Sequence, residues 1–303
     1  MACFNPLLAV DNGVDPETGK HRIKILPKRS DLNLEKVRER YGNNLMMLPC
    51  GHCVACAQDY ARTWQARIMC EALYHEKKCF LTLTYKDAPE NPSKEDLREF
   101  IKKLRNKFGK GLKFFAAGEK GSVTRRSHYH MILFGEDFAF DRQVMTKRGL
   151  NLVYGSSTLD SLWKHGFTSI GCLDVASAGY VSKYCDKKKI SSQDDGEFVM
   201  MSRGLGRQFF EDNGYNLFDS DFVYFDGNKF KIPRYFLKLA NEHPDFYTRL
   251  LAMDYADRKR AVANAFRYDK NRSVNVEEEG MIAAASNALA KKQHQEGDVR
   301  DVL

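Results

Sequence analysis

Apolar and polar residues alternate along short stretches between residues 79 and 135. Residues 79–85 (CFLTLTY) alternate between polar and apolar side chains after an apolar start, while residues 113–119 (KFFAAGE) and 127–135 (SHYHMILFG) are rich in apolar and aromatic side chains. A period of two, with many aromatic and β-branched residues, is typical of β-strands. We therefore predict three strands here, the last two paired as an antiparallel hairpin through the polar residues 120–126. Residues 167–171 (FTSIG) are predicted to form a further strand.

Helical spacing of apolar residues indicates the intervening elements. Ser93 is a good N-cap for a helix over residues 94–108. Residues 58–77, 158–165 and 177–185 show the same period more weakly. Strands alternating with helices in this way predict a mixed α/β fold.

The remainder of the chain gives fewer signals. Residues 11–40 are charged with weak periodicity, and residues 222–232 resemble a hairpin around Asp226-Gly227-Asn228. Residues 233–267 are expected to be mainly helical. We predict three regions: 1–76, with a cysteine-rich segment and a helix; 77–190, the α/β core; and 191–303, a mixed, largely helical region for DNA binding or another accessory role.

The composition suits a partner with many negative charges. The chain has 48 basic and 40 acidic residues, a net charge of +8 and a pI near 8.9. No stretch approaches the roughly 18 apolar residues of a membrane span, and the N-terminus lacks the pattern of a signal peptide. We therefore expect a cytosolic protein that needs no membrane and whose cysteines are reduced thiols or metal ligands.

Three cysteines at three-residue spacing, Cys50, Cys53 and Cys56, predict a zinc knuckle. With 8 cysteines in 303 residues, chance supplies roughly 0.006 such triplets. A structural zinc needs four thiolate or imidazole ligands. Cys3 is the first choice for the fourth ligand and His52 the second. The alternative is that the thiols pack as small hydrophobic side chains.

His128 and His130 lie on the same face of their predicted strand, because side chains two residues apart point the same way. Two such imidazoles can hold one metal ion, and Glu119, at the end of the preceding strand, can reach it. Arg125 and Arg126 come just before the histidine strand, at the edge of this site, and could contact a phosphate. Alternatively, the histidines are hydrogen-bonded residues of a half-buried strand and Glu119 is a solvated turn residue, since chance alone supplies roughly 0.2 such histidine pairs.

Tyr180 and Tyr184 are four residues apart, so on a helix they share one face with Lys183 beside them. A tyrosine hydroxyl can attack a phosphodiester and expel the 3′-oxygen if a metal ion withdraws charge from the phosphate. Lys183 would favour the phenolate. Lys187 and Lys188 are further candidate DNA contacts. The alternative is a pair of packed core tyrosines.

The order of these motifs resembles the replication initiators of microviruses, most of all the gokushovirus branch, which belong to the HUH endonucleases. The resemblance covers the chain from about Cys3 to Tyr235. It departs from the family at Ser127, where proline is expected. The residues that carry it are Pro49-Cys50-Gly51-His52-Cys53 through Cys56, residues 79–85, Gly118-Glu119-Lys120-Gly121, residues 128–135, Leu162-Trp163, Gly166-Phe167, residues 180–184, Met201-Ser202-Arg203 and Pro233-Arg234-Tyr235.

The resemblance implies a ferredoxin-like HUH domain with a central antiparallel sheet and an N-terminal zinc knuckle. It implies that His128, His130 and Glu119 bind Mg²⁺ or Mn²⁺, and that Tyr180 and Tyr184 nick origin DNA through a 5′-phosphotyrosine and rejoin the released strand. The expected setting is rolling-circle replication in the cytoplasm of an infected bacterium. The expected partners are single-stranded and origin DNA with the host helicase and DNA polymerase.

Two alternatives stay open. One is another HUH nuclease, a relaxase or a transposase. The other is a non-catalytic zinc-knuckle protein that binds nucleic acid. The chain has no ATP-binding phosphate loop, and residues 190–303 either grip duplex DNA or recruit a host helicase.

Overall fold

The computed structural model describes residues 3–15, 21–27, 31–121, 123–148, 151–185, 196–220 and 222–240. The chain divides into two compact units, one containing residues up to Ala57 and one containing Gln58–Leu239. Among the described residues, no helix combines the length and apolar character required to cross a membrane.

The first unit is built on a small antiparallel sheet that the sequence did not predict. Strand β1 (Leu7–Val14) pairs with β2 (His21–Ile25) on one side and with β3 (Leu45–Leu48) on the other. Helix α1 (Leu34–Tyr41) and a single 3₁₀ turn (Gly42–Asn44) connect β2 to β3. The interior consists of the buried side chains Leu8, Ala9, Val10, Leu45 and Met46.

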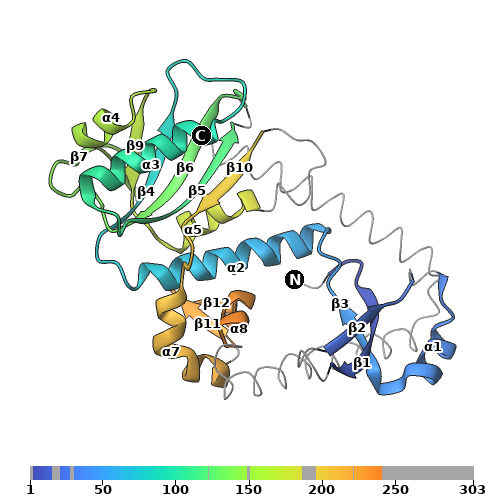
Figure 1. The fold of residues 1–303 in the computed structure, drawn as a ribbon. Helices are drawn as coiled ribbons and strands as arrows, with labels where there is room; N and C mark the ends of the chain where they lie inside the picture. Colours follow the sequence, from blue (N-terminus) through green and yellow to red (C-terminus); the bar gives the residue numbers. More distant parts are fainter. Residues whose placement is uncertain are drawn as a thin grey trace. The chain divides into compact units, whose positions relative to one another are not determined.

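A larger antiparallel sheet organises the second unit (Figure 1). Within the described residues its seven strands run in the order β10-β5-β6-β4-β9-β8-β7. Their bounds are β4 Lys78–Thr84, β5 Lys113–Lys120, β6 Ser127–Phe134, β7 Gln143–Arg148, β8 Asn151–Gly155, β9 Thr168–Gly171 and β10 Phe198–Met201. The mixed α/β fold with a central antiparallel sheet is confirmed. The predicted hairpin is β5–β6, which lies inside the sheet between β10 and β4.

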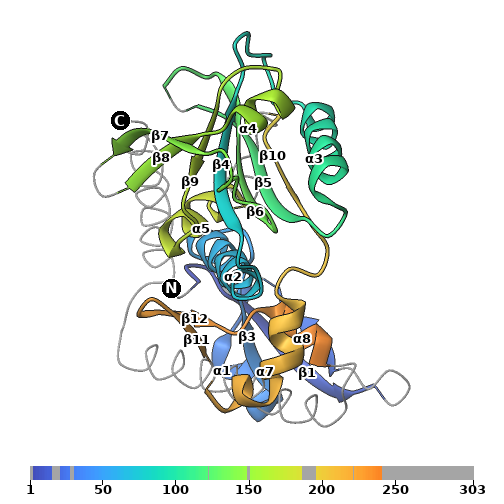
Figure 2. The ribbon, with the colours of Figure 1, turned by 90° about the vertical axis from the view of Figure 1, so that its left-hand side faces the viewer.

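Helix α3 (Lys94–Phe108) covers one face of this sheet (Figure 2). The Ser93 hydroxyl accepts a hydrogen bond from the Asp96 N–H and caps the helix start, as predicted. Its apolar stripe meets Tyr129 and the other odd-numbered residues of β6. Helix α4 (Ser157–Leu162) contributes Leu159 to the same core.

Helices α2 (Val54–Ala72) and α5 (Val175–Ser182) pack on the opposite face. Ile68 and Val181 contact the even-numbered side chains of β6, such as Ile132. Because the strand alternates, the even-numbered His128 and His130 belong to this second face. Helix α5 therefore lies beside the predicted metal ligands, with its Tyr180 ring against His130.

The remaining described elements are α7 (Arg207–Ser220), β11 (Phe222–Phe225), β12 (Asn228–Lys231) and α8 (Arg234–Ala240). The predicted hairpin around Asp226-Gly227 is confirmed, and both residues have the positive φ, 46° and 74°, that its tight turn requires. The part of the predicted helical segment 233–267 that follows residue 240 lies outside the described residues.

Candidate metal centre and tyrosine pair

The strand register brings three candidate ligands together at one end of the sheet. Glu119 on β5 lies directly opposite His128 on β6. Thr82 on β4 lies opposite His130. All four side chains share the face that α5 covers, because they occupy equivalent positions in their pleats.

The Glu119, His128 and His130 side chains converge on one point. Glu119 Oε1 is 2.8 Å from His128 Nε2 and 3.1 Å from His130 Nε2, and the two Nε2 atoms are 3.1 Å apart. Glu119 and His130 are buried, while His128 is partly accessible. Two metal ligands at about 2.1 Å and at right angles to each other are about 3 Å apart, so this triangle fits one face of an octahedral site.

The outer ring nitrogens of both histidines have partners that direct Nε2 toward this point. His128 Nδ1 lies 3.0 Å from the carbonyl oxygen of Arg126, to which it can only donate. His130 Nδ1 lies 3.2 Å from Thr82 Oγ1. Each Nε2 can either carry a proton that bonds to Glu119 or, when the imidazole proton is on Nδ1 alone, present its lone pair to a cation at the same point.

The Glu119 carboxylate is held in its charged form. Burial alone would raise the pKa of Glu119, but the hydrogen bonds and charges of His128 and His130 outweigh burial and keep this pKa well below its usual range. One carboxylate with two imidazoles is a ligand set suited to a divalent cation. These three residues could therefore hold a metal ion.

Both predicted tyrosines reach this cluster. Tyr180 Oη is 3.3 Å from His130 Nε2, and Tyr184 Oη donates a 2.6 Å hydrogen bond to Glu119 Oε1. Tyr180 is half-buried and Tyr184 is only 7% exposed. Burial and the charge on Glu119 raise the pKa of Tyr184 far above its usual value.

We predicted that the two tyrosines share one continuous helix, but in the structure they do not. Helix α5 ends at Ser182, Lys183 is its C-cap, and Tyr184 follows in the next helical turn. Their rings nevertheless meet edge to face, with centroids 5.6 Å apart. Lys183, which directly precedes Tyr184, is half-buried.

The β5–β6 connection holds the predicted phosphate contacts. Arg125 is exposed and has a positive φ of 54°. Arg126 donates from one terminal nitrogen to the carbonyl oxygens of Tyr85 and Lys86, at 2.8 and 2.9 Å, so part of its guanidinium anchors β4. Lys187 and Lys188 lie outside the described residues.

Ser127 stands where the resemblance led us to expect proline. Its buried hydroxyl donates a 2.8 Å hydrogen bond to the carbonyl oxygen of Pro89. This bond ties the start of β6 to the loop after β4. The strand therefore enters the sheet in register without the rigid proline ring.

Sequence reasoning missed the close contact between α2 and α5 that positions α5. A Cβ atom on Gly179 would lie 2.6 Å from Gln65 Nε2, and this nitrogen donates a 2.7 Å hydrogen bond to the Val175 carbonyl. The close approach of α2 to α5 sets the depth of Tyr180, the next residue. A glycine immediately before a candidate nucleophile was the signal available in the sequence.

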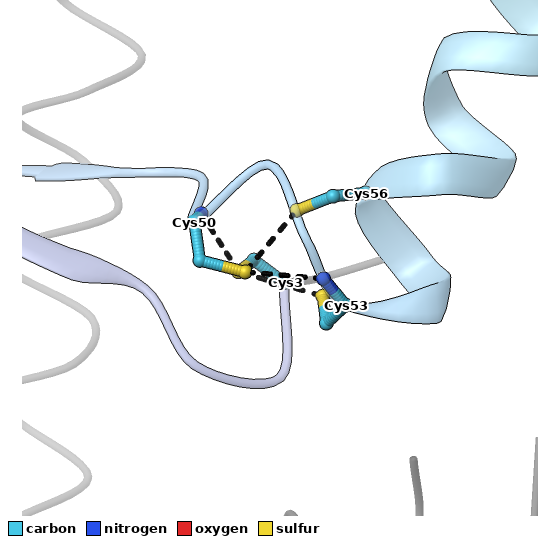
Figure 3. A group of neighbouring side chains, drawn as sticks. All are labelled: Cys3, Cys50, Cys53 and Cys56. Carbon is cyan, nitrogen blue, oxygen red and sulfur yellow. Dashed lines mark hydrogen bonds between the residues drawn. The ribbon is translucent and has the colours of Figure 1, made fainter. Parts of the chain in front are cut away.

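A second cluster, in the first unit, contains the four predicted cysteines (Figure 3). Cys3 Sγ is 3.8 Å from Cys53 Sγ, and Cys50 Sγ is 3.9 Å from Cys56 Sγ. Sulfur atoms bound at about 2.3 Å around a tetrahedral zinc are about 3.8 Å apart. His52 is exposed and does not belong to the group.

Backbone N–H groups surround this sulfur cluster. The N–H of Cys50 donates to Cys3 Sγ at 3.3 Å, and the N–H of Cys53 donates to Cys50 Sγ at 3.4 Å. Such bonds stabilise thiolate charge. The four cysteines therefore form a group that could hold a metal ion, and Cys3 ties the N-terminal segment to the start of α2.

Residues 78–189 match a family model of replication-associated proteins, the ORF2 family. This segment contains both the Glu119–His128–His130 cluster and the two tyrosines. The chain is also 31% identical over 238 residues to the replication-associated protein ORF2 of Spiroplasma virus 4, and the match covers 70% of this chain and 72% of that protein. The chain belongs to the family of microvirus replication-associated proteins.

Two further members of this replication-associated family are similar over comparable lengths. VP4 of Bdellovibrio phage phiMH2K is 29% identical over 219 residues, which are 65% of this chain and 69% of VP4. ORF4 of Chlamydia phage 1 is 29% identical over 224 residues, which are 66% of this chain and 56% of ORF4. No solved structure matches the chain. The family membership supports a role in initiating replication.

Proposed function

We propose that this replication-associated protein nicks and rejoins single-stranded DNA at a phage origin through a 5′-phosphotyrosine intermediate. One observation carries the proposal: the hydroxyls of Tyr180 and Tyr184 both lie within hydrogen-bond range of the Glu119, His128 and His130 cluster. A packing role alone would not require two phenol groups to point at the same candidate ligands.

In the first step, a tyrosine oxygen bonds to phosphorus and the bond from phosphorus to the 3′-oxygen breaks. The phenol proton is given up, and the leaving 3′-oxygen takes up a proton, so charge is balanced. The downstream strand remains attached through its 5′-phosphate, and the upstream strand ends in a 3′-hydroxyl that can prime synthesis. Mg²⁺ or Mn²⁺ held by the cluster would withdraw charge from the phosphate. Lys183 would stabilise the phenolate.

The second tyrosine gives the protein a second transfer. After one round of synthesis the partner tyrosine attacks the regenerated junction, and the freed 3′-hydroxyl attacks the first phosphotyrosine. This second reaction forms the bond from phosphorus to the 3′-oxygen again and releases the tyrosine. The strand is thereby closed without an external energy source, because each step exchanges one phosphodiester for another.

The test is a covalent-adduct gel with single-stranded DNA labelled at its 3′ end. Since the origin sequence is not encoded in the protein, the substrate is a randomised pool, incubated with Mn²⁺ and separated under denaturing conditions. We expect a labelled protein band that disappears in the Tyr180→Phe, Tyr184→Phe double variant. An adduct of undiminished intensity in the double variant would disprove the assignment of the nucleophiles.

A non-catalytic DNA-binding protein is the competing function. It would bind the same pool without forming any adduct, whether or not Mn²⁺ is present. A single-tyrosine HUH nuclease would be revealed if one of the two single tyrosine variants kept both cleavage and rejoining. The proposed setting is the cytoplasm of the infected host, with host helicase and polymerase acting on the 3′-hydroxyl primer.

A further inference from the structure

The row of residues that contains the metal cluster continues across the sheet beyond the cluster. Thr84 on β4 lies opposite His128. On its other side, the Thr84 backbone N–H and hydroxyl both donate to the carbonyl oxygen of Phe167, at 2.9 and 3.1 Å. These bonds extend the β4–β9 register by one pair. Glu119, His128, Thr84 and Phe167 therefore form one row across four neighbouring chain segments.

The Phe167 side chain is 71% exposed, although it precedes a central strand. Its neighbour Thr168 is buried, and its hydroxyl donates a 2.6 Å hydrogen bond to Asp160 of α4, on the face that α3 covers. Since side chains alternate, Phe167 points to the other face, which carries the metal cluster. Two strand spacings separate it from His128, which is about 10 Å.

Basic side chains flank this ring toward the end of the sheet. Lys86 and Lys164 are exposed and, with His165 and Phe167, line a hollow of about 440 Å³. The exposed Arg126 lies next to Lys86, because its guanidinium donates to the Lys86 carbonyl oxygen. The hollow is at the end of the sheet, since Asp160 and Trp163 from the α3 face also line it, together with Asp87. The Asp160 carboxylate is engaged by Thr168.

The exposed ring is held on a fixed backbone. A Cβ atom on Gly166 would lie 2.4 Å from the Thr84 carbonyl oxygen and 2.5 Å from the Lys86 N–H nitrogen. The segment before β9 can approach β4 this closely only because residue 166 has no side chain. The Lys86 N–H also donates to the His165 carbonyl oxygen at 2.8 Å. The backbone that carries the Phe167 ring is therefore held against the end of β4.

We propose that Phe167 is a stacking platform for a base of single-stranded DNA, and that Lys86 and Arg126 contact the phosphates beside that base. Aromatic rings next to positive charge are the usual means of binding single strands without reading sequence. The proposal rests on the proposed function, because it assigns the path by which the strand leaves the metal cluster.

The experiment compares two labelled probes, an oligothymidylate and an abasic chain of the same length, by fluorescence anisotropy. The full-length protein carries Tyr180→Phe and Tyr184→Phe throughout, so no covalent adduct forms. We expect Phe167→Ala to weaken oligothymidylate binding roughly five- to hundred-fold and to leave abasic binding unchanged. Phe167→Trp should restore binding. Lys86→Ala should weaken both probes and reduce the salt dependence of binding.

Phe140→Ala is the matched control, because Phe140 is an aromatic side chain of 60% exposure in the loop after the far end of β6. It should bind both probes as the parent does. Equal affinity of the Phe167→Ala and parent proteins for oligothymidylate would overturn the stacking proposal. Equal losses on both probes would overturn it as well, since bases would then play no part. The nicking proposal is tested separately by the adduct gel, which can succeed or fail whatever the result here.

Discussion

Thr82 and His130 face each other across β4 and β6, and the Thr82 hydroxyl oxygen lies 3.2 Å from His130 Nδ1. A threonine in the middle of a sheet face would ordinarily be replaceable by valine. When His130 carries its proton on Nδ1, this hydroxyl can accept a hydrogen bond from that N–H, and Nε2 is then free to bind a metal. The Thr82 hydroxyl therefore favours one tautomer of His130, the candidate metal ligand.

Thr82→Val should weaken binding of the divalent metal about 10- to 100-fold, because removing a group that orients a ligand typically has this effect. Thr82→Ser keeps the hydroxyl and should bind nearly as the wild type does. Titration with Mn²⁺ by calorimetry measures both. Adduct formation should recover in Thr82→Val at saturating Mn²⁺. An unchanged Mn²⁺ affinity in Thr82→Val would show that the hydroxyl does not orient His130.

The cysteine cluster should contain one equivalent of zinc per chain. Cys3→Ser should lose this zinc as fully as Cys53→Ser does, because both sulfur atoms belong to the same group. Elemental analysis after purification in metal-free buffer measures the content. His52→Ala should retain zinc, and Cys172→Ser, which removes an exposed thiol, is the second control. If zinc were retained in Cys3→Ser but lost in His52→Ala, the fourth ligand would be His52 and not Cys3.

Glu71 should make the free energy of unfolding depend on pH in the acidic range. Its buried carboxylate accepts 2.7 Å hydrogen bonds from His75, Lys113 and the Gly206 N–H. Burial raises the pKa of Glu71, but these bonds outweigh burial and lower it from 4.5 to about 2. The carboxylate's contribution is therefore complete above the unfolded pKa and is lost as the pH falls toward the folded value. The shift corresponds to about 3 kcal/mol.

Denaturant unfolding at pH 7 and near pH 3 tests this dependence. Glu71→Gln should be less stable than the wild type at pH 7, and the difference should shrink toward pH 3. Glu95→Gln removes an exposed carboxylate paired with Arg98 and should change stability by less than about 1 kcal/mol at either pH. A Glu71→Gln deficit that is equally large at both pH values would contradict the assignment.

The strands that carry the site, and helix α3 on the opposite face of the sheet, could be predicted because their signals are local. Residues 79–85 and 127–135 alternate or run apolar, and Ser93 caps α3 through its own backbone neighbours. The β5–β6 hairpin then places Glu119 beside His128 by register alone. The cysteine spacing is equally local. For these elements, short-range chemistry and the final fold agree.

The rest depends on contacts between distant parts of the chain. Strand β1 gains its partner β3 only through the pairing of residues such as Leu7 and Leu48, and most of β2 is exposed, so residues 11–40 showed weak periodicity. The β7–β8 hairpin exposes Val144 and Met145, which conceals its pattern. Likewise, Gly179 is a local signal of a close approach, but nothing near it in the sequence identifies Gln65 as the residue that lies against it.

Gly166→Ala should separate the Phe167 segment from β4. The new Cβ atom would meet backbone atoms of Thr84 and Lys86, which cannot turn aside as a side chain can. We expect a loss of about 1–3 kcal/mol in unfolding free energy, as is usual for overpacked sites, and weaker binding of oligothymidylate.

Gly171→Ala is the matched control on β9, since its Cβ would meet Phe80 at an ordinary 3.7 Å. It should be close to the wild type in both measurements. If Gly166→Ala bound and unfolded as Gly171→Ala does, the close approach of the two segments would not be important for placing the ring.

Tyr180 should perform the first cleavage and Tyr184 the second. Tyr180 is half-buried, so a phosphate can approach its hydroxyl from solvent beside His130. Tyr184 is 7% exposed and its hydroxyl is bound to Glu119, so it must first be released from that bond. Tyr180→Phe should therefore reduce the initial adduct at least roughly 100-fold, whereas Tyr184→Phe should form the adduct at near the wild-type rate but fail to rejoin strands. Mass spectrometry of the DNA-linked peptide identifies the modified tyrosine, and a first adduct found on Tyr184 would reverse the proposed order.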